Sequence, residues 1–213
     1  MRVLFRSQIK HLSSLVTRMT LGMLLLCGSA FATSWHVDVV TTPLIGNPSG
    51  PFSIDFQFNN GSVLGNNSAT ISNFSYSGGG PVGSPSLFGG VTGNIGSTVV
   101  FNNSAAFQEL FQAFTPGTNL RFDIELTTNV DGAIPDVFVF GILDKDLFNI
   151  PTTGLGDSLL LVNLSSPFPT PQTFRGAGAF ASVTVTAPEP EAYMSLLAGL
   201  PLLILVGFRK KTI

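Results

Sequence analysis

Apolar and polar residues alternate strictly from residue 52 to residue 58, with Phe or Ile at every even position and Ser, Asp or Gln at every odd one. The same period of two returns from Phe122 to Leu126, where Asp123 and Glu125 separate the apolar residues. Successive side chains of a β-strand point to opposite faces, so each run predicts a strand with one apolar and one polar face.

Other segments predict further strands. Residues 137–143 and 159–164 are apolar on both faces, as expected of central strands that are buried on each side. The last strand is predicted at residues 183–186, and weaker candidates are residues 35–40, 69–76 and 98–102. Residues 107–114 remain open between a short helix and an irregular edge strand, because their apolar residues fit both spacings.

The connecting segments are rich in residues that favour turns, namely Asn59-Asn60-Gly61, Gly78-Gly79-Gly80-Pro81, Pro116-Gly117 and Asp131-Gly132. Gly and Asn tolerate positive φ angles, and Pro fixes φ. Short strands separated by such turns predict an all-β protein with a single β-sandwich or jelly-roll-like domain over residues 33–186.

Residues 1–32 have the features of an export signal. Four basic residues (Arg2, Arg6, Lys10 and Arg18) precede a short apolar run over residues 19–27, and Ala30-Phe31-Ala32 supplies a small-x-small cleavage pattern. We expect cleavage after Ala32. The one cysteine, Cys27, leaves with the signal, so the mature protein is expected to have neither a disulfide nor thiol chemistry.

Residues 187–213 combine three parts in a fixed order. Pro188-Glu189-Pro190 comes first, an uncharged run of 17 residues follows from Ala192 to Phe208, and Arg209-Lys210-Lys211 comes after it. As a helix the run would be about 25 Å long, which is within the usual range for a membrane span. The three cations are expected to stay on the cytoplasmic side, so that the rest of the chain lies across the membrane.

This order of parts resembles the PEP-CTERM sorting signal of bacteria, with Pro188, Glu189 and Pro190 in the motif positions. The resemblance implies recognition by an exosortase, a membrane protease-transpeptidase that cleaves near the motif. The precursor would first be anchored in the inner membrane by a single transmembrane sorting helix, and then be displayed at the cell surface or released into the extracellular matrix. An ordinary C-terminal anchor with a chance Pro-Glu-Pro is the alternative.

The domain itself is similar to a group of PEP-CTERM proteins with a Phe-rich sandwich. The matching stretches are residues 51–62, 69–80, 114–129 and 150–153. That group is defined by its architecture and sorting and has no assigned reaction, so the resemblance implies no catalytic residues.

Between the two targeting segments, three basic residues stand against ten acidic residues, which gives a net charge of −7. Seven of the ten basic residues of the whole chain lie in the targeting segments. A surface of this sign repels nucleic acid and anionic membranes, so no nucleic-acid partner is expected.

The mature sequence offers little for catalysis. Its one histidine, His36, has no nucleophile motif beside it and is expected to be an exposed or edge-strand residue; a single histidine without cysteine cannot build a zinc site. Asp123 and Glu125 would project from one strand face about 6.5 Å apart, which leaves a glycan-cleaving enzyme as a minor alternative. No catalytic residue, metal or cofactor is therefore predicted.

Two features could bind ligands. Asp144-Lys145-Asp146, with Asp131 and Asp136 upstream, is oxygen-rich but lacks a calcium-loop motif, so we interpret it as a solvated turn. Asn- and Ser-rich loops with an aromatic residue could bind polysaccharide, with Tyr76 a better candidate than Trp35. The sequence thus predicts an exported, non-catalytic surface or matrix protein, with an exopolysaccharide-binding module as the alternative.

Overall fold

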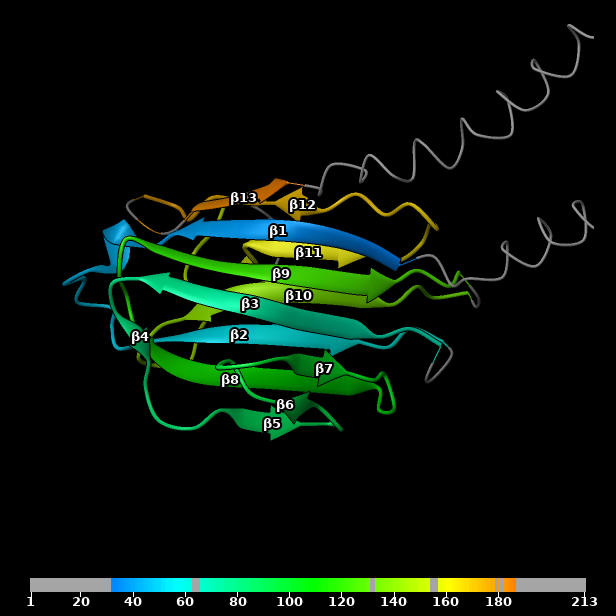
Figure 1. Ribbon diagram of the computed structural model, residues 1–213. Helices are drawn as coiled ribbons and strands as arrows, with labels where there is room; N and C mark the ends of the chain where they lie inside the picture. Colours follow the sequence, from blue (N-terminus) through cyan, green and yellow to red (C-terminus); the bar gives the residue numbers. More distant parts are fainter. Residues whose placement is uncertain are drawn as a thin grey trace, which may run out of the picture. The chain divides into compact units, whose positions relative to one another are not determined.

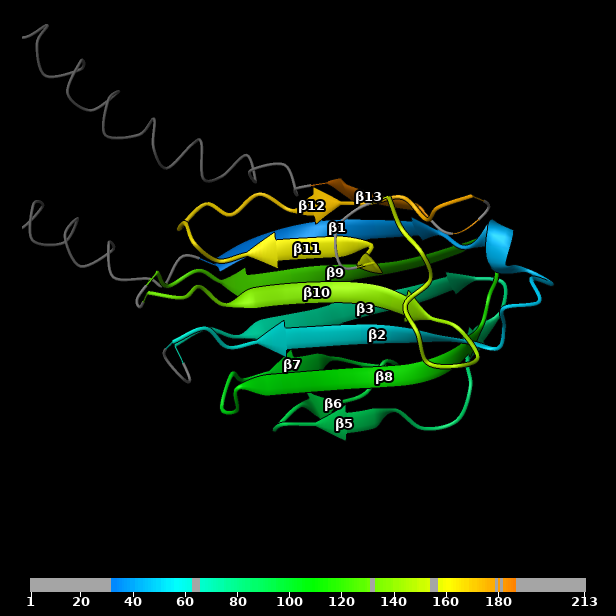
Figure 2. The same cartoon turned by 180° about the vertical axis from the view of Figure 1, so that it is seen from behind.

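The computed structural model describes residues 32–186, apart from residues 63–65, 131–132, 154–156, 179 and 181. These residues form two antiparallel β-sheets, with one short 3₁₀ turn, η2 (Thr42–Leu44) (Figures 1 and 2). The all-β prediction is therefore confirmed. The predicted export signal and the C-terminal sorting signal, apart from Ala32, lie outside the described residues.

Sheet A has six strands, in the order β13 (Ser182–Thr186), β1 (Ala32–Val40), β9 (Asn119–Thr127), β3 (Ala69–Ser77), β7 (Val99–Phe101) and β6 (Thr92–Gly93). Sheet B has seven strands, in the order β12 (Gln172–Thr173), β11 (Leu160–Asn163), β10 (Val137–Leu143), β2 (Phe52–Asn59), β8 (Phe107–Thr115) and β4 (Gly80–Pro81), with β5 (Ser86–Phe88) also paired to β8. Consecutive strands often lie in different sheets, so the central pairings β1–β9, β3–β9 and β2–β8 join strands that are far apart in the sequence.

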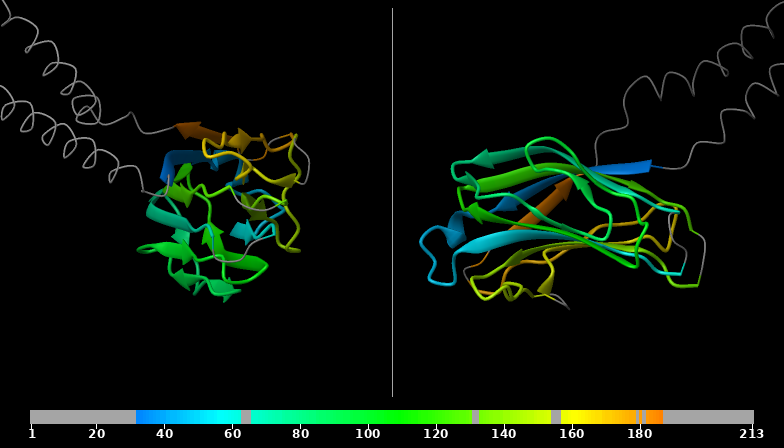
Figure 3. Two further views of the ribbon diagram at one scale, coloured as in Figure 1. Left: turned by 90° about the vertical axis from the view of Figure 1, so that its right-hand side faces the viewer. Right: turned by 90° about the horizontal axis from the view of Figure 1, so that it is seen from below.

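The inner faces of the two sheets share one aromatic core. Figure 3 shows the two layers between which these side chains lie. Phe122 of sheet A packs its ring against Phe56 and Phe140 of sheet B, with centroids 5.1 Å apart in both pairs and T-shaped geometry. Phe101 and Phe138 make a similar contact across the sheets at 6.3 Å. Edge-to-face contacts of this kind add to the stabilisation from burial, so the alternating Phe positions form the centre of the core.

Residues 107–114 form a regular strand, β8, that pairs with β2 on one side and with β4 and β5 on the other. The helical alternative and the edge-strand alternative are both wrong. The helical spacing arises because apolar residues occupy both faces of the strand. Leu110 and Phe114 are buried in the core, whereas Phe107 and Phe111 lie half-buried on the outer face.

Two of the predicted glycine turns have a steric basis. Gly79 has a φ of 71°, and a Cβ there would lie 2.0 Å from the Thr115 carbonyl oxygen. A Cβ on Gly61 would lie 1.8 Å from the Ile134 carbonyl oxygen. A side chain at either position would collide with backbone, so both turns require glycine. The predicted Asp131-Gly132 turn lies outside the described residues.

The outer face of sheet B is partly covered. After β10 the chain makes a tight turn and runs back beside the end of that strand, where Ile150 N donates to the Ile142 carbonyl. The loop that continues toward β11 runs in front of sheet B in Figure 2. Along the described part of the chain, no helix has the length and apolar character needed to cross a membrane.

Candidate functional site

A pocket of about 220 Å³ opens at the end of the sandwich where β9 and β11 finish and β3 and β10 begin. The residues that line it are Asn66, Asn67, Asn129, Val130, Ala133, Pro135, Asp136, Leu164 and Ser165. They come from the loops just outside the strands, so the two sheets hold the walls of the pocket in place. Three carboxamides, one carboxylate and the Ser165 hydroxyl make up its polar side, and aliphatic residues make up the rest.

Asp136 anchors the polar side of the pocket and is only 3% exposed. Its Oδ1 accepts a 2.7 Å hydrogen bond from the Gly61 backbone N–H. Its Oδ2 accepts from Nδ2 of Asn67 at 2.9 Å and from Nδ2 of Asn103 at 2.8 Å. A buried carboxylate is stable when such donors replace the lost water. Asp136 therefore ties together three distant loops at this end of the fold.

Asn67 in turn fixes the backbone of Asn129. The Asn67 Oδ1 accepts from the Asn129 N–H at 2.8 Å, and its Nδ2 donates to the Asn129 carbonyl at 3.0 Å. The Asn129 side chain donates from Nδ2 to the Asn66 carbonyl at 2.6 Å. Asn129, which lines the pocket, is thus held at both its backbone and its side-chain nitrogen, and its Oδ1 accepts no hydrogen bond within the described residues.

A second buried carboxyl group, Asp55, lies on the outer face of β2. It too is only 3% exposed, but one donor serves it: Gln57 Nε2 donates to Oδ2 at 2.7 Å. Its Oδ1 is buried without a hydrogen-bond partner among the described residues. Burial, with a smaller contribution from the charge of Glu109, raises the pKa of Asp55 to about 7, although the bond from Gln57 acts to lower it.

The turn after β10 supplies the cover over Asp55. Gly141 lies opposite Asp55 in the register, and a Cβ on Gly141 would lie 2.6 Å from Oδ1 of Asn149. The Asn149 side chain therefore occupies the space that a side chain at Gly141 would need. Its Oδ1 is also buried without a partner among the described residues. The polar face of this strand thus meets protein, not open solvent.

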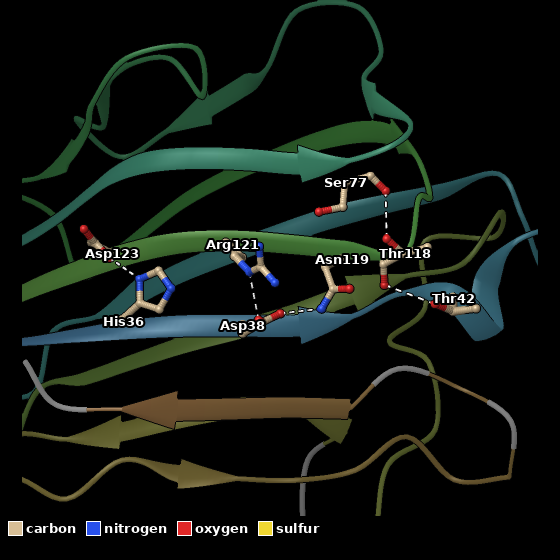
Figure 4. A network of polar contacts seen from close by, with 8 residues as sticks. All are labelled: His36, Asp38, Thr42, Ser77, Thr118, Asn119, Arg121 and Asp123. Atoms are coloured by element: carbon tan, nitrogen blue, oxygen red, sulfur yellow. Dashed lines mark hydrogen bonds and ion pairs between the residues drawn. The ribbon is translucent and has the colours of Figure 1, made fainter.

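On the outer face of sheet A, polar side chains pair across β1 and β9 (Figure 4). His36 Nδ1 lies 2.6 Å from Asp123 Oδ1, and Asn73 donates to the other carboxylate oxygen at 2.7 Å. Burial acts to raise the pKa of Asp123, but the hydrogen bonds from Asn73 and His36 outweigh it and the pKa is lowered. His36 is exposed, as expected, but it lies on a strand paired on both sides, so the edge-strand expectation for it is wrong.

The same face holds a second ion pair. Arg121 Nε donates to Asp38 Oδ2 at 2.8 Å, and Asn119 Nδ2 donates to its other oxygen at 2.6 Å (Figure 4). These bonds outweigh the opposing effect of burial and lower the pKa of Asp38. Asp38 and Asp123 are therefore both stabilised in the charged form. The lowered pKa of Asp123 is the opposite of what a proton-donating carboxyl group needs, so of the two residues considered for glycan cleavage Asp123 does not suit the role of general acid.

The acidic turn at residues 144–146 stabilises its own backbone. Asp144 Oδ1 accepts from the backbone N–H groups of Asp146 at 2.9 Å and Phe148 at 3.0 Å, and Lys145 pairs with Asp146 at 2.7 Å. Asp136, which the sequence placed near this turn, belongs to the pocket at the other end of β10. Over the part of the chain that the structure describes, no group of three or more His, Cys, Asp or Glu side chains could hold a metal ion.

The aromatic residues considered for sugar stacking lie inside the fold. Trp35 is 5% exposed, and the half-buried Tyr76 packs against the core with its hydroxyl buried and unpartnered among the described residues. Burial raises the pKa of Tyr76 to about 12. Neither ring offers an open platform. Exposed aromatic rings in the described residues include Phe88, Phe148 and Phe168.

Sequence reasoning missed the pocket residues as a group. Asn67, Asn103 and Asn129 stand in polar loops whose composition indicated turns, and Asp136 was assigned to a different acidic cluster. A signal was present, since each of these residues lies within three positions of a predicted strand, but the pairing of distant loops was needed to bring them together. No family model, curated protein or solved structure matches this chain.

Proposed function

We propose that this chain is an exported precursor whose β-sandwich acts without catalysis at the cell surface or in the extracellular matrix. The observation that carries the proposal is the unbroken order of Pro188-Glu189-Pro190, an apolar run and Arg209-Lys210-Lys211. In this proposal the inner membrane holds the precursor until an exosortase cleaves near the Pro-Glu-Pro motif. The strongly acidic domain between the targeting segments remains in solution outside.

The bounds of the folded domain support the proposal. Its first strand begins at Ala32, after which we expect the signal to be removed, and its last strand ends at Thr186, two positions before Pro188. The sandwich therefore fills the interval between the two processing points. The repeated passage of the chain between the sheets also supports a jelly-roll-like topology, a common frame for binding proteins as well as enzymes.

Intact mass spectrometry of the protein from the culture matrix and from membranes tests the sorting proposal. We expect matrix protein with one terminus near Thr33 and the other near the Pro-Glu-Pro motif. A Glu189→Ala variant should accumulate uncut in the membrane fraction, whereas Glu125→Ala, on the exposed face of β9, should be processed normally. A mass that retains Arg209 to Ile213 in every fraction would reduce the protein to a simple membrane-anchored domain.

A second candidate function is binding of exopolysaccharide. The observation that favours it is the pocket beside Asp136, whose walls carry carboxamide and hydroxyl groups next to aliphatic side chains. Such a mixture suits sugars, which present both hydroxyl groups and C–H faces. Electrophoresis through gels that contain the organism's own exopolysaccharide tests it. Retardation is expected, and unchanged mobility would remove this candidate.

A further inference from the structure

The polar atoms of the pocket divide into those that are used and those that are available. The side-chain oxygen and nitrogen atoms of Asp136 and Asn67 are hydrogen-bonded to one another and to the surrounding loops. Asn129 Oδ1 and Ser165 Oγ make no hydrogen bond within the described residues, although both residues line the pocket. Two exposed residues of the pocket lining thus carry an acceptor and a hydroxyl group that are not hydrogen-bonded within the described residues, beside a network that holds the surrounding loops.

The chemistry of the lining excludes several ligand classes. Among the described residues that line the pocket none is basic, and the Asp136 carboxylate is one of them, so an anion would be repelled. A metal cation would find one carboxylate whose two oxygens already accept three hydrogen bonds. A wholly apolar ligand would leave Asn129 Oδ1 and Ser165 Oγ unpaired and dehydrated. A neutral molecule with several hydroxyl groups meets none of these objections.

The size of the pocket limits the possible ligands further. The pocket measures about 220 Å³, which is below the ~300–1,000 Å³ typical of sites for drug-sized molecules. A pocket of this size suits a single ring better than an extended chain. Val130, Pro135 and Leu164 supply an apolar wall for the C–H face of such a ring.

We infer that this pocket is a subsite for a single uncharged sugar residue, such as the end or a branch of a neutral glycan. Asn129 Oδ1 accepts from one sugar hydroxyl, and Ser165 Oγ exchanges a hydrogen bond with another. The carboxylate of Asp136 beneath them excludes uronic acids. The inference rests on the second candidate function and specifies which glycans that function would recognise.

Saturation-transfer NMR on the full-length chain in detergent micelles tests the subsite. The probes are the methyl glycosides of glucose, galactose, mannose and N-acetylglucosamine, with methyl glucuronide as the acidic counterpart. We expect transfer to at least one neutral glycoside, with a Kd on the order of 1 mM for a ligand this small. Methyl glucuronide should show none. Silence from all neutral probes at several times that concentration, or equal transfer to the glucuronide, would overturn the inference.

Two variants locate the binding. Asn129→Ala and Ser165→Ala should each weaken the glycoside about three- to tenfold. Asn129→Ala removes the exposed hydrogen bond from its side chain to the Asn66 carbonyl, but Asn67 still holds the Asn129 backbone. The first variant should therefore keep the wild-type melting temperature within a few degrees. Asn94→Ala, at an exposed turn between β6 and β7, is the matched control and should bind as the wild type does.

The gel assay separates this inference from the function on which it rests. Exopolysaccharide that retards the wild type and Asn129→Ala equally would place the glycan elsewhere, which overturns the subsite and leaves carbohydrate binding standing. If the protein binds neither the exopolysaccharide nor the glycosides, both the subsite and the carbohydrate-binding function are overturned. The sorting proposal depends on neither result, because it is decided by the masses of the processed chain.

Discussion

Asp136 and Asp55 are equally buried, at 3% exposure, but the protein treats them differently. Three N–H groups from two other loops, Gly61 and Asn67 from the β2–β3 loop and Asn103 from the β7–β8 loop, donate to Asp136. Within the described residues Asp55 has one donor, Gln57, which lies two positions away on the same strand, and one oxygen without a partner. The first carboxylate joins distant segments, whereas the second joins none and bears the penalty of burial.

The comparison shows that burial of a charge does not by itself reveal its role. At Asp136 the donors replace water, so the charge can organise a pocket and hold its loops together. At Asp55 a single donor does not compensate for the lost water, so burial raises the pKa of the carboxyl group to about 7. Removal of the Asp136 side chain should therefore destabilise the fold, whereas replacement of Asp55 by a neutral residue of the same shape should stabilise it.

The largest effect is expected from Asp136→Ala. The substitution removes the acceptor of the Gly61 N–H and one of the two acceptors of Nδ2 on both Asn67 and Asn103 in a buried site. The free energy of unfolding should therefore fall by roughly 3–5 kcal/mol. Urea denaturation of the processed protein measures it. Asp146→Ala, which removes an exposed carboxylate of the same size, is the control and should change stability by less than about 1 kcal/mol. A loss below 1 kcal/mol for Asp136→Ala would contradict the anchoring role.

Asp55→Asn should act in the opposite direction. The amide has nearly the shape of the carboxylate, its oxygen can still accept from Gln57, and it carries no charge to bury. From the rise of the pKa from 3.8 to about 7, at ~1.4 kcal/mol per pH unit, we expect a gain of roughly 2–4 kcal/mol at pH 8. The same urea titration at pH 8 measures it. A loss of stability would mean that the charged form of Asp55 has a favourable partner.

The pH profile of that gain tests its cause. Between pH 3.8 and about 7 the folded protein holds a proton on Asp55 that the unfolded chain has released, so the wild type loses stability as pH rises through this interval. Glu109, whose pKa is also raised by burial, contributes with the same sign. The advantage of Asp55→Asn should therefore be small at pH 4, grow toward pH 7 and stay level above it. An advantage that is equal at pH 4 and pH 8 would exclude titration of Asp55 as its source.

The two aspartates also show what the sequence could and could not predict. Alternation placed β2 and β9 correctly, because the apolar face of each strand follows directly from a period of two. The pattern is the same around Asp55 and Asp123, yet Asp55 is buried under the turn after β10, whereas Asp123 is partly exposed beside His36. Periodicity assigns a residue to a face but does not tell what covers that face.

The pocket was beyond prediction for a related reason. Asp136 and its donor Gly61 are 75 positions apart, and Asn103 lies 33 positions from Asp136. Such pairs depend on which strands become neighbours, and that choice is made by the packing of the whole core. A loop composition of Asn, Ser and Gly describes solvated turns equally well, so composition alone could not distinguish the anchoring residues from ordinary turn residues.

A smaller effect is expected at Tyr76, which resembles Asp55 in having a buried polar atom without a partner among the described residues. Tyr76→Phe removes the hydroxyl and keeps the ring against the core, so stability should be unchanged or should rise by up to about 1 kcal/mol. Thermal unfolding monitored by circular dichroism measures it. A loss above about 1 kcal/mol would show that the hydroxyl has a favourable partner such as an ordered water.

The smallest effect is expected from the exposed pair His36 and Asp123, which sets the lower end of the comparison. The two side chains are about 49% and 37% exposed, so water competes with their contact, and exposed pairs usually contribute about 0.2–1 kcal/mol. A double-mutant cycle with His36→Ala and Asp123→Ala should give a coupling energy below about 1 kcal/mol that shrinks further in 1 M salt. A coupling above 2 kcal/mol, insensitive to salt, would place Asp123 in the same class as Asp136. The stability of this sandwich would then depend on its surface carboxylates as much as on the one beneath the pocket.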